Sequence, residues 1–301
     1  MEILNKTHNS IQTSLITFGN PSSSNGKDTI ICITGNPGFV DFYLEFGQEL
    51  HSKTGLPVCI IGHAGHDNVS DMQCSKLQGQ EHLFNLKGQL KHKLDLLDNI
   101  IDNKSKLHFV GHSIGSWFVI ELLQNYDHLY KKTLSINLLF PTIQRMAKSK
   151  NGIWLNNYVR KIHGLVLFLI KLICFLPERV SLFLINIYLR LCGLPAHYDK
   201  RFLKYLNPHI FEKVLFLAFD EMDNVTTLNK EGVDKVKHLT NIIYSVDDGW
   251  APLSFMKDLM IYQPYLQMIE VNTDHAFIFK SSQFIAFMVS DFIKHKISAG
   301  S

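Results

Sequence analysis

The chain has 301 residues, 46% of them hydrophobic, which suits one large domain with an insertion better than two independent domains. Its net charge of +3 at pH 7 is too small to indicate nucleic acid as a partner. The number of cysteines is odd, and three of them lie within apolar runs, which favours buried thiols in a reducing compartment over a disulfide framework; the five are Cys32, Cys59, Cys74, Cys174 and Cys192.

The first part of the chain alternates between predicted strands and helices. Residues 1–20 contain no apolar signal segment or small-residue cleavage site, so we predict no signal peptide. Ile11–Phe18 is a predicted strand, and Thr29–Ile33 is wholly apolar and β-branched, as is typical of a strand buried on both faces. A predicted helix over 43–54 and a further buried strand, Val58–Ile61, continue the pattern.

A nucleophile elbow follows a predicted helix over 89–102. The apolar run 107–110 enters Gly-His-Ser-Ile-Gly at residues 111–115, and a helix-compatible segment, 117–123, leaves it. This is the G-x-S-x-G motif in the strand–turn–helix context that the elbow requires. The pattern indicates that Ser113 is exposed on a strained turn, with Gly111 and Gly115 letting strand and helix pass close together.

After the strand Thr133–Leu139 the alternating pattern stops at an insertion, residues 145–213. Two mostly apolar segments, 159–176 and 180–194, are joined at Pro177, which predicts a helical hairpin. Neither offers about 20 uninterrupted apolar residues, so a simple membrane span is not expected. The insertion carries 12 Lys and Arg against 3 Asp and Glu, a net +9, whereas the remaining chain carries 18 against 24, a net −6. Such an apolar, basic hairpin must cover the active site, enter a lipid surface, or do both.

The alternating pattern resumes with strands over 241–246 and 268–271 and an amphipathic closing helix over 284–295. Alternating strands and helices imply parallel pairing with right-handed crossovers. Two acids, Asp247 and Asp248, follow the first strand, and His275 follows the second. The order Ser113, acid, histidine is that of the α/β-hydrolase triad.

These residue types fit acyl transfer. A serine needs a base to take its proton, and the base needs a carboxylate to orient it. His275 is the predicted base because it follows the last strand, whereas the acid could be either Asp247 or Asp248. The predicted oxyanion donors are the backbone N–H of Ile114, directly after the nucleophile, and that of Asn36, on the loop after the strand Thr29–Ile33.

Two histidines, His63 and His66, stand close enough in sequence to suggest a metal pair. No cysteine or carboxylate partner stands at a suitable spacing. We therefore predict that these side chains form hydrogen bonds in loops near the active site, and that the protein needs neither metal nor cofactor.

Taken together, several short motifs resemble one family, the lipid droplet-associated hydrolases of the α/β-hydrolase superfamily. The resemblance spans about residues 30–293 and rests on Gly35-Asn36-Pro37-Gly38, His63-Ala64-Gly65-His66, Asn85-Leu86-Lys87-Gly88-Gln89 with His92-Lys93, Gly111-His112-Ser113-Ile114-Gly115, Leu139-Phe140-Pro141-Thr142-Ile143, Asn151-Gly152, Asp248-Gly249-Trp250-Ala251-Pro252 and His275-Ala276-Phe277.

The resemblance implies that Ser113, Asp248 and His275 form the triad, which selects Asp248 over Asp247. It also implies a lipid-ester substrate, such as a sterol ester or acylglycerol, and association with lipid droplets and the cytoplasmic face of the endoplasmic reticulum. The insertion is the expected anchor.

We therefore expect an α/β-hydrolase fold, with a mostly parallel central sheet flanked by helices and a helical cap. Its core is residues 1–144 and 214–301, and its cap is 145–213. The expected function is that of a serine carboxylic-ester hydrolase acting on lipid esters at a droplet or membrane surface. The alternatives are a weakly active or non-catalytic droplet surface protein that retains the fold, and a soluble small-molecule esterase.

Overall fold

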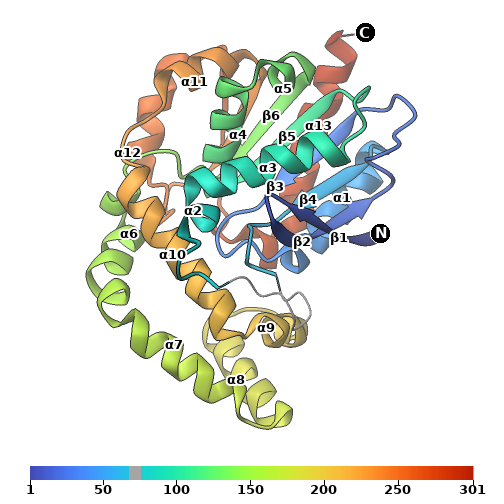
Figure 1. Cartoon of the computed structure of the whole chain (residues 1–301). Coiled ribbons are helices and arrows are strands. Elements are labelled where there is room, and N and C mark those ends of the chain that lie inside the picture. Colours follow the sequence, from blue (N-terminus) through green and yellow to red (C-terminus); the bar gives the residue numbers. More distant parts are fainter. Residues whose placement is uncertain (68–75, 301) are drawn as a thin grey trace.

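A single eight-stranded sheet forms the centre of the molecule (Figure 1). The structure is a computed structural model and describes residues 1–67 and 76–300. The strand order is β1-β2-β4-β3-β5-β6-β7-β8. Pairs β1–β2 and β2–β4 are antiparallel and all others are parallel, which confirms the predicted mostly parallel sheet. The strands are β1 (Glu2–His8), β2 (Ile11–Phe18), β3 (Thr29–Ile33), β4 (Val58–Ile61), β5 (Leu107–His112), β6 (Thr133–Leu139), β7 (Thr240–Tyr244) and β8 (Gln267–Glu270).

Helices cover both faces of this sheet. Side chains alternate between the faces of a strand, so Ile31 and Ile33 of β3 pack into one core and Ile30 and Cys32 into the other. The first core includes residues of α3 (Leu86–Ile100), α4 (Ile114–Asn125) and α11 (Lys230–Val236). The second includes residues of α1 (Leu44–Thr54) and α13 (Ser282–Gly300). Three short helices complete the core region: α2 (Glu81–Phe84), α5 (Asp127–Lys132) and α12 (Leu253–Met256).

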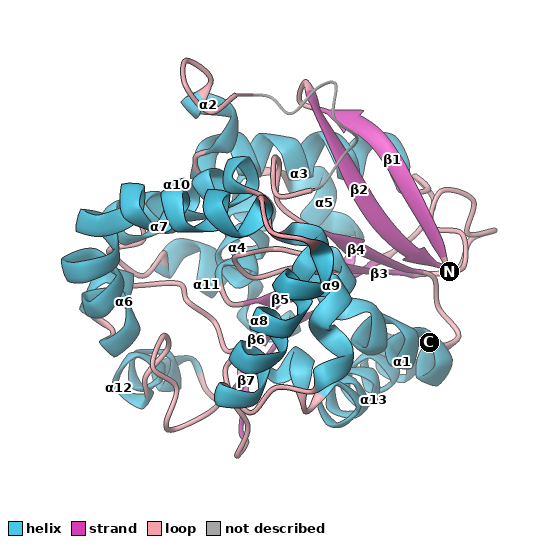
Figure 2. Ribbon diagram, turned by 90° about the horizontal axis from the view of Figure 1, so that it is seen from below, coloured by secondary structure: helices cyan, strands magenta, loops and turns pink. Residues whose placement is uncertain are grey.

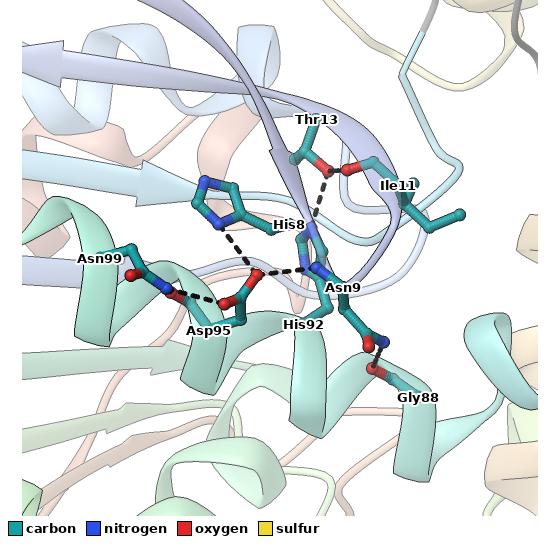
Figure 3. A network of polar contacts seen from close by, with 8 residues as sticks. All are labelled: His8, Asn9, Ile11, Thr13, Gly88, His92, Asp95 and Asn99. Carbon is teal, nitrogen blue, oxygen red and sulfur yellow. Dashed lines mark hydrogen bonds and ion pairs between the residues drawn. The ribbon is translucent and has the colours of Figure 1, made fainter.

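The edge strand β1 was not predicted, because it mixes polar residues with apolar ones and is mostly exposed. It forms a hairpin with β2 that is tied to α3 by polar contacts (Figure 3). The Asp95 carboxylate accepts the backbone N–H of Asn9 at 2.7 Å and lies 3.3 Å from Nδ1 of His8. Thr13 Oγ1 of β2 lies 2.7 Å from Nε2 of His92. These bonds hold the hairpin against the helix layer.

The insertion contains the predicted helical hairpin, α7 (Arg160–Cys174) and α8 (Glu178–Leu191), which extends from the sheet (Figure 1). It also contains α6 (Lys150–Trp154), α9 (Asp199–Tyr205) and the first part of α10 (Pro208–Asn224). The expected boundary at residue 213 falls within α10, so this helix belongs to both cap and core. In the view from below, α8 and α9 lie in front of the strands and α10 lies beside them (Figure 2).

Each helix of the hairpin leaves a row of apolar side chains in solvent. On α7 and its end the exposed residues are Ile162, Leu165, Phe168, Leu169, Leu172, Phe175 and Leu176. On α8 they are Val180, Phe183, Leu184, Ile187, Tyr188 and Leu191. Both rows recur at the i, i+3, i+4, i+7 spacing of one helix face. No helix within residues 1–67 and 76–300 combines the length and the apolar character needed to cross a membrane.

The cysteines divide into two groups. Cys32 and Cys59 are buried free thiols in β3 and β4, as predicted. Cys174 and Cys192 are free but exposed, near the ends of α7 and α8, so the expectation of burial was wrong for them. Apolar neighbours indicated burial there, but in this hairpin they are themselves exposed. Cys74 lies outside the described residues.

Candidate active site

Ser113 stands on the turn between β5 and α4, as predicted. Its backbone adopts φ +54° and ψ −123°, a strained conformation for a residue with a side chain. A Cβ added at Gly111 would come within 2.8 Å of the Gly115 backbone, and one added at Gly115 within 2.2 Å of the Ile33 carbonyl oxygen. The two glycines therefore let the strand, the helix and the neighbouring β3 pack closely beneath the serine.

The structure brings Ser113, His275 and Asp248 into one hydrogen-bonded chain. Ser113 Oγ lies 2.9 Å from Nε2 of His275, and Nδ1 of His275 lies 2.7 Å from Oδ2 of Asp248. With a carboxylate as its partner, Nδ1 carries the proton and donates it. Nε2 is then an acceptor, placed to receive the hydroxyl proton of the serine.

Asp248, and not Asp247, contacts the histidine. Its second oxygen, Oδ1, accepts the N–H groups of Trp250 at 2.7 Å and of Ala251 at 3.0 Å. Asp247 is exposed, whereas Asp248 both contacts the histidine and holds the following turn. Burial alone would raise the pKa of Asp248, but the hydrogen bond and charge of His275 and the two N–H groups hold this pKa below its usual range.

His112, the residue before the serine, links two parts of the site. Its Nε2 lies 2.9 Å from the carbonyl oxygen of His275, so this nitrogen is the donor. Its Nδ1 then accepts the hydroxyl of Tyr43 at 2.5 Å, and the Tyr43 oxygen accepts the Gly35 N–H at 2.9 Å. Burial lowers the pKa of His112 to about 3, so the ring stays neutral at pH 7. The roles of His112 and Tyr43 are not predictable from the sequence, because nothing in the spacing of these residues indicates a series of hydrogen bonds between them.

The loop of residues 35–38 lies directly against the nucleophile, where the oxyanion donors were predicted. A Cβ added at Gly35 would come within 2.9 Å of the Ser113 Cβ. Ile114 is the first residue of α4, so its N–H has no acceptor within the helix. The Asn36 side chain reaches helix α10, where its Nδ2 donates to the Val214 carbonyl at 3.2 Å and to Oε1 of Glu221 at 3.0 Å.

The two histidines of the His-Ala-Gly-His segment support this loop from beneath. Nδ1 of His66 lies 2.6 Å from the carbonyl oxygen of Pro37, which confirms the predicted hydrogen bond for this histidine. For His63 the prediction was wrong, because neither ring nitrogen has a hydrogen-bond partner among the described residues. The His63 ring packs under Gly38, where a Cβ would come within 2.5 Å of its Cδ2. Burial lowers the pKa of His66 to about 3. Within the described residues, no group of three or more His, Cys, Asp or Glu could hold a metal ion.

A cavity of about 720 Å³ extends from Ser113 and His275 into the cap. Its walls are mostly apolar and come from the loops around residues 35–43 and from the cap helices. Two of the lining residues, Leu184 and Tyr188 of α8, are 39% and 51% exposed, so the cavity reaches the exposed face of the hairpin. The residues of the apolar wall include Phe39, Phe42, Leu155, Ile173, Ile185, Phe202, Phe211, Val214 and Met222.

One acidic residue, Glu221, interrupts this apolar wall and was missed in the sequence. It is 3% exposed and lines the cavity. It belongs to α10 beyond the expected insertion boundary, in a segment with several acidic neighbours, so no sequence signal separates it from surface carboxylates.

Comparison with known proteins identifies similar chains and folds. The family model described as "Lipid-droplet associated hydrolase" matches residues 26–278. A lipid droplet-associated hydrolase of Drosophila melanogaster is 38% identical over 298 residues, covering 95% of this chain and 96% of that one. Two solved structures share the fold: a meta-cleavage product hydrolase from Pseudomonas fluorescens (15% identity, TM-score 0.65, 97% of each chain) and an esterase from Exiguobacterium antarcticum (10% identity, TM-score 0.66, 98% of this chain and 100% of that one). The predicted α/β-hydrolase fold is therefore confirmed.

Proposed function

This chain belongs to the family of lipid-droplet associated hydrolases, and from that premise we propose that it cleaves lipid esters with Ser113 as nucleophile, His275 as base and Asp248 as orienting acid. The observation that carries the proposal is the hydrogen-bonded chain of these three side chains at the base of an apolar cavity. It combines a serine poised for acyl transfer with a site suited to a hydrocarbon chain.

In the first step Ser113 Oγ attacks the ester carbonyl carbon while its proton passes to Nε2 of His275. The carbonyl oxygen becomes an oxyanion, for which the backbone N–H groups of Ile114 and Asn36 are the proposed donors. Asp248 keeps the proton of the neutral ring on Nδ1 and stabilises the imidazolium that forms.

In the second step the tetrahedral intermediate collapses. The bond from the carbonyl carbon to the alcohol oxygen breaks, and Nε2 of His275 gives its proton to that oxygen. Water then attacks the acyl-enzyme, His275 takes a proton from it, and the proton returns to Ser113 Oγ as the carboxylic acid leaves. The residues of the chain supply every proton transfer in this cycle.

The cavity supports a lipid as the acyl donor. Aliphatic and aromatic side chains line it from the nucleophile to α8, and transfer of an acyl chain from water into such a site contributes roughly 0.8 kcal/mol per CH₂. We propose sterol esters or acylglycerols as substrates.

The hairpin of α7 and α8 supports a lipid surface as the place of action. Its exposed apolar rows can enter a surface from one side, and the net +9 of residues 145–213 attracts anionic head groups by about 1 kcal/mol for each nearby cation. We propose that this insertion binds lipid droplets and the cytoplasmic face of the endoplasmic reticulum.

Fluorophosphonate labelling tests the chemistry. Wild-type protein should be labelled and Ser113→Ala should not, while both give the same circular dichroism spectrum. Equal labelling of the two would place the nucleophile elsewhere. A folded wild type that neither takes the label nor hydrolyses esters would instead indicate a non-catalytic surface protein.

A further inference from the structure

The Asn36 side chain is held by helix α10, which runs from the cap into the core, rather than by its own loop. Both of its hydrogen-bond acceptors, the Val214 carbonyl and the Glu221 carboxyl, lie on α10, two helical turns apart. Glu221 is almost fully buried and is the one acidic side chain among the described residues that line the cavity. Burying a carboxyl group costs free energy unless hydrogen bonds compensate, and Asn36 supplies such a bond to Glu221.

The loop that this side chain anchors is part of the site. Gly35 packs against Ser113 so closely that a Cβ would come within 2.9 Å of the serine Cβ. The Pro37 carbonyl is held by His66 from the other side. The loop is thus fixed at Asn36 by α10 and at Pro37 by His66.

We propose that Glu221 is a positioning residue that acts through Asn36: its carboxyl oxygen fixes the carboxamide and so aligns the loop against the developing oxyanion. This inference rests on the proposed function, and it assigns a part in the chemistry to α10, the helix that continues from the cap into the core. Misalignment of such a donor raises the barrier of the chemical step without weakening substrate binding.

Glutamine is the closest substitute for this residue. Burial raises the pKa of Glu221 to about 8, against the hydrogen bond from Asn36, and the charge of Asp220 adds to the rise. The side chain is therefore mostly neutral at pH 7, and the amide oxygen of glutamine can accept the same N–H from Asn36. Leucine matches the size of the side chain but offers no acceptor.

The first test measures kcat and KM for p-nitrophenyl butyrate at pH 7. Glu221→Leu should lower kcat about 10- to 100-fold with KM within twofold of wild type, by comparison with the loss of an oxyanion donor. Glu221→Gln should restore kcat to within about threefold. Glu212→Leu, on the same helix, is the matched control and should leave kcat unchanged. Wild-type kcat in Glu221→Leu, or a rise in KM alone, would overturn the proposal.

A double-mutant cycle with Asn36→Ala separates positioning from direct contact with the substrate. If Glu221 acts through Asn36, Asn36→Ala lowers kcat to a similar extent and the double variant with Glu221→Leu is no slower. If Glu221 contacts the substrate itself, the two losses multiply, and the proposal is wrong. Should Glu221→Leu fail to fold, Asn36→Ala decides alone, because it removes the same bonds from the loop side and wild-type kcat would overturn the idea.

These outcomes are distinct from a failure of the proposed function. Hydrolysis that survives Ser113→Ala would refute the nucleophile, whatever the Glu221 variants show. Hydrolysis that requires Ser113 but ignores Glu221 would refute only the positioning role.

Discussion

The active site and the α7–α8 hairpin distribute polarity in opposite ways. In the site, polar side chains are buried and paired: Ser113 is 8% exposed and Asp248 5%. In the hairpin, apolar side chains stand in solvent: Phe168 is 56% exposed and Phe183 64%. Buried polar groups and contiguous exposed apolar groups are both unusual in a soluble domain, and each has a specific use.

Under the proposed function, chemistry and surface recognition are encoded in separate segments of this chain. Buried hydrogen bonds fix the geometry of reacting groups. Exposed apolar side chains contribute favourable free energy only when they are transferred from water into an apolar phase. The cavity joins the two regions, because Ser113 and the hairpin residues Leu184 and Tyr188 all line it. The two regions should therefore respond differently to substitution.

The largest expected effect is in the core, at the paired aspartates. Asp248→Asn should lower kcat by roughly 10³- to 10⁴-fold, because an amide donor opposite His275 favours the wrong tautomer, as loss of the acid does in serine proteases. Asp247→Asn should change kcat less than about threefold, since Asp247 is exposed. Steady-state hydrolysis of p-nitrophenyl butyrate measures both.

The reverse ranking of these two variants would show that the acid is Asp247. Because Asp248 also accepts two backbone N–H groups, its variant needs a thermal unfolding curve beside the kinetics. A loss of kcat without a large fall in the melting temperature separates catalysis from folding.

The next effect is in the hairpin and should spare the core. Serine in place of Phe168, Phe175, Phe183 and Leu191 removes four exposed apolar side chains, each contributing about 1.5 to 3 kcal/mol when it leaves water. We expect binding to artificial droplets of triacylglycerol and phospholipid to weaken at least about 100-fold, as measured by flotation. Hydrolysis of p-nitrophenyl butyrate should stay within about twofold of wild type.

A matched control exists on the core surface. Ile261 and Tyr265 are 74% and 67% exposed, but they belong to the core segment 214–301 and not to the hairpin. The double variant Ile261→Ser with Tyr265→Ser should therefore not change flotation. If the hairpin variant still floats with droplets, another surface binds the lipid and the hairpin is only a cap. If it also loses soluble-ester hydrolysis, the two regions are not separable.

The smallest effect concerns pH and again distinguishes the core. The pKa of buried His66 is lowered to about 3, against 6.5 for the free side chain. Below pH 6.5 the unfolded chain therefore binds a proton that the folded chain does not, and stability falls as the pH drops toward 3. When the pH falls from 7 to 5, the free energy of unfolding should decrease in both proteins, and the decrease should be about 1 to 2 kcal/mol smaller in His66→Gln than in wild type.

Urea unfolding at the two pH values measures this difference, and the same substitution at exposed His82 is the control. Identical pH responses of wild type and His66→Gln would mean that His66 is not held neutral in the folded protein. The hairpin substitutions should leave the pH response unchanged.

Patterns in the sequence predict the strands that build the sheet. Runs such as Thr29–Ile33 and Val58–Ile61 consist mostly of apolar, β-branched residues, as is typical of a strand buried on both faces. The edge strand β1 has one solvated side and lacks that signature. The chain order likewise predicts Ser113 and His275, because the elbow and the last strand fix where each can stand.

Contacts between segments distant in sequence could not be predicted. Asn36 and Glu221 are separated by 185 positions, and the bond between them depends on how α10 crosses the site. The choice of Asp248 over Asp247 came from the family resemblance, because either residue ends the strand equally well in the sequence alone. That Asp248 also holds the turn depends on backbone geometry around Trp250 that spacing does not encode.

Helix α10 touches both regions at once. Glu221 of this helix accepts a hydrogen bond from Asn36. The same helix contacts Arg160 at the start of α7. The Arg160 guanidinium lies 5.0 Å from the centroid of the Phe219 ring and forms an ion pair with Asp223. The two contacts therefore lie on one continuous helix. Any coupling between the two regions must be symmetrical, by thermodynamic linkage. If lipid around α7 changes the affinity of the site for its ligand by some factor, then a ligand in the site changes the affinity of α7 for lipid by the same factor.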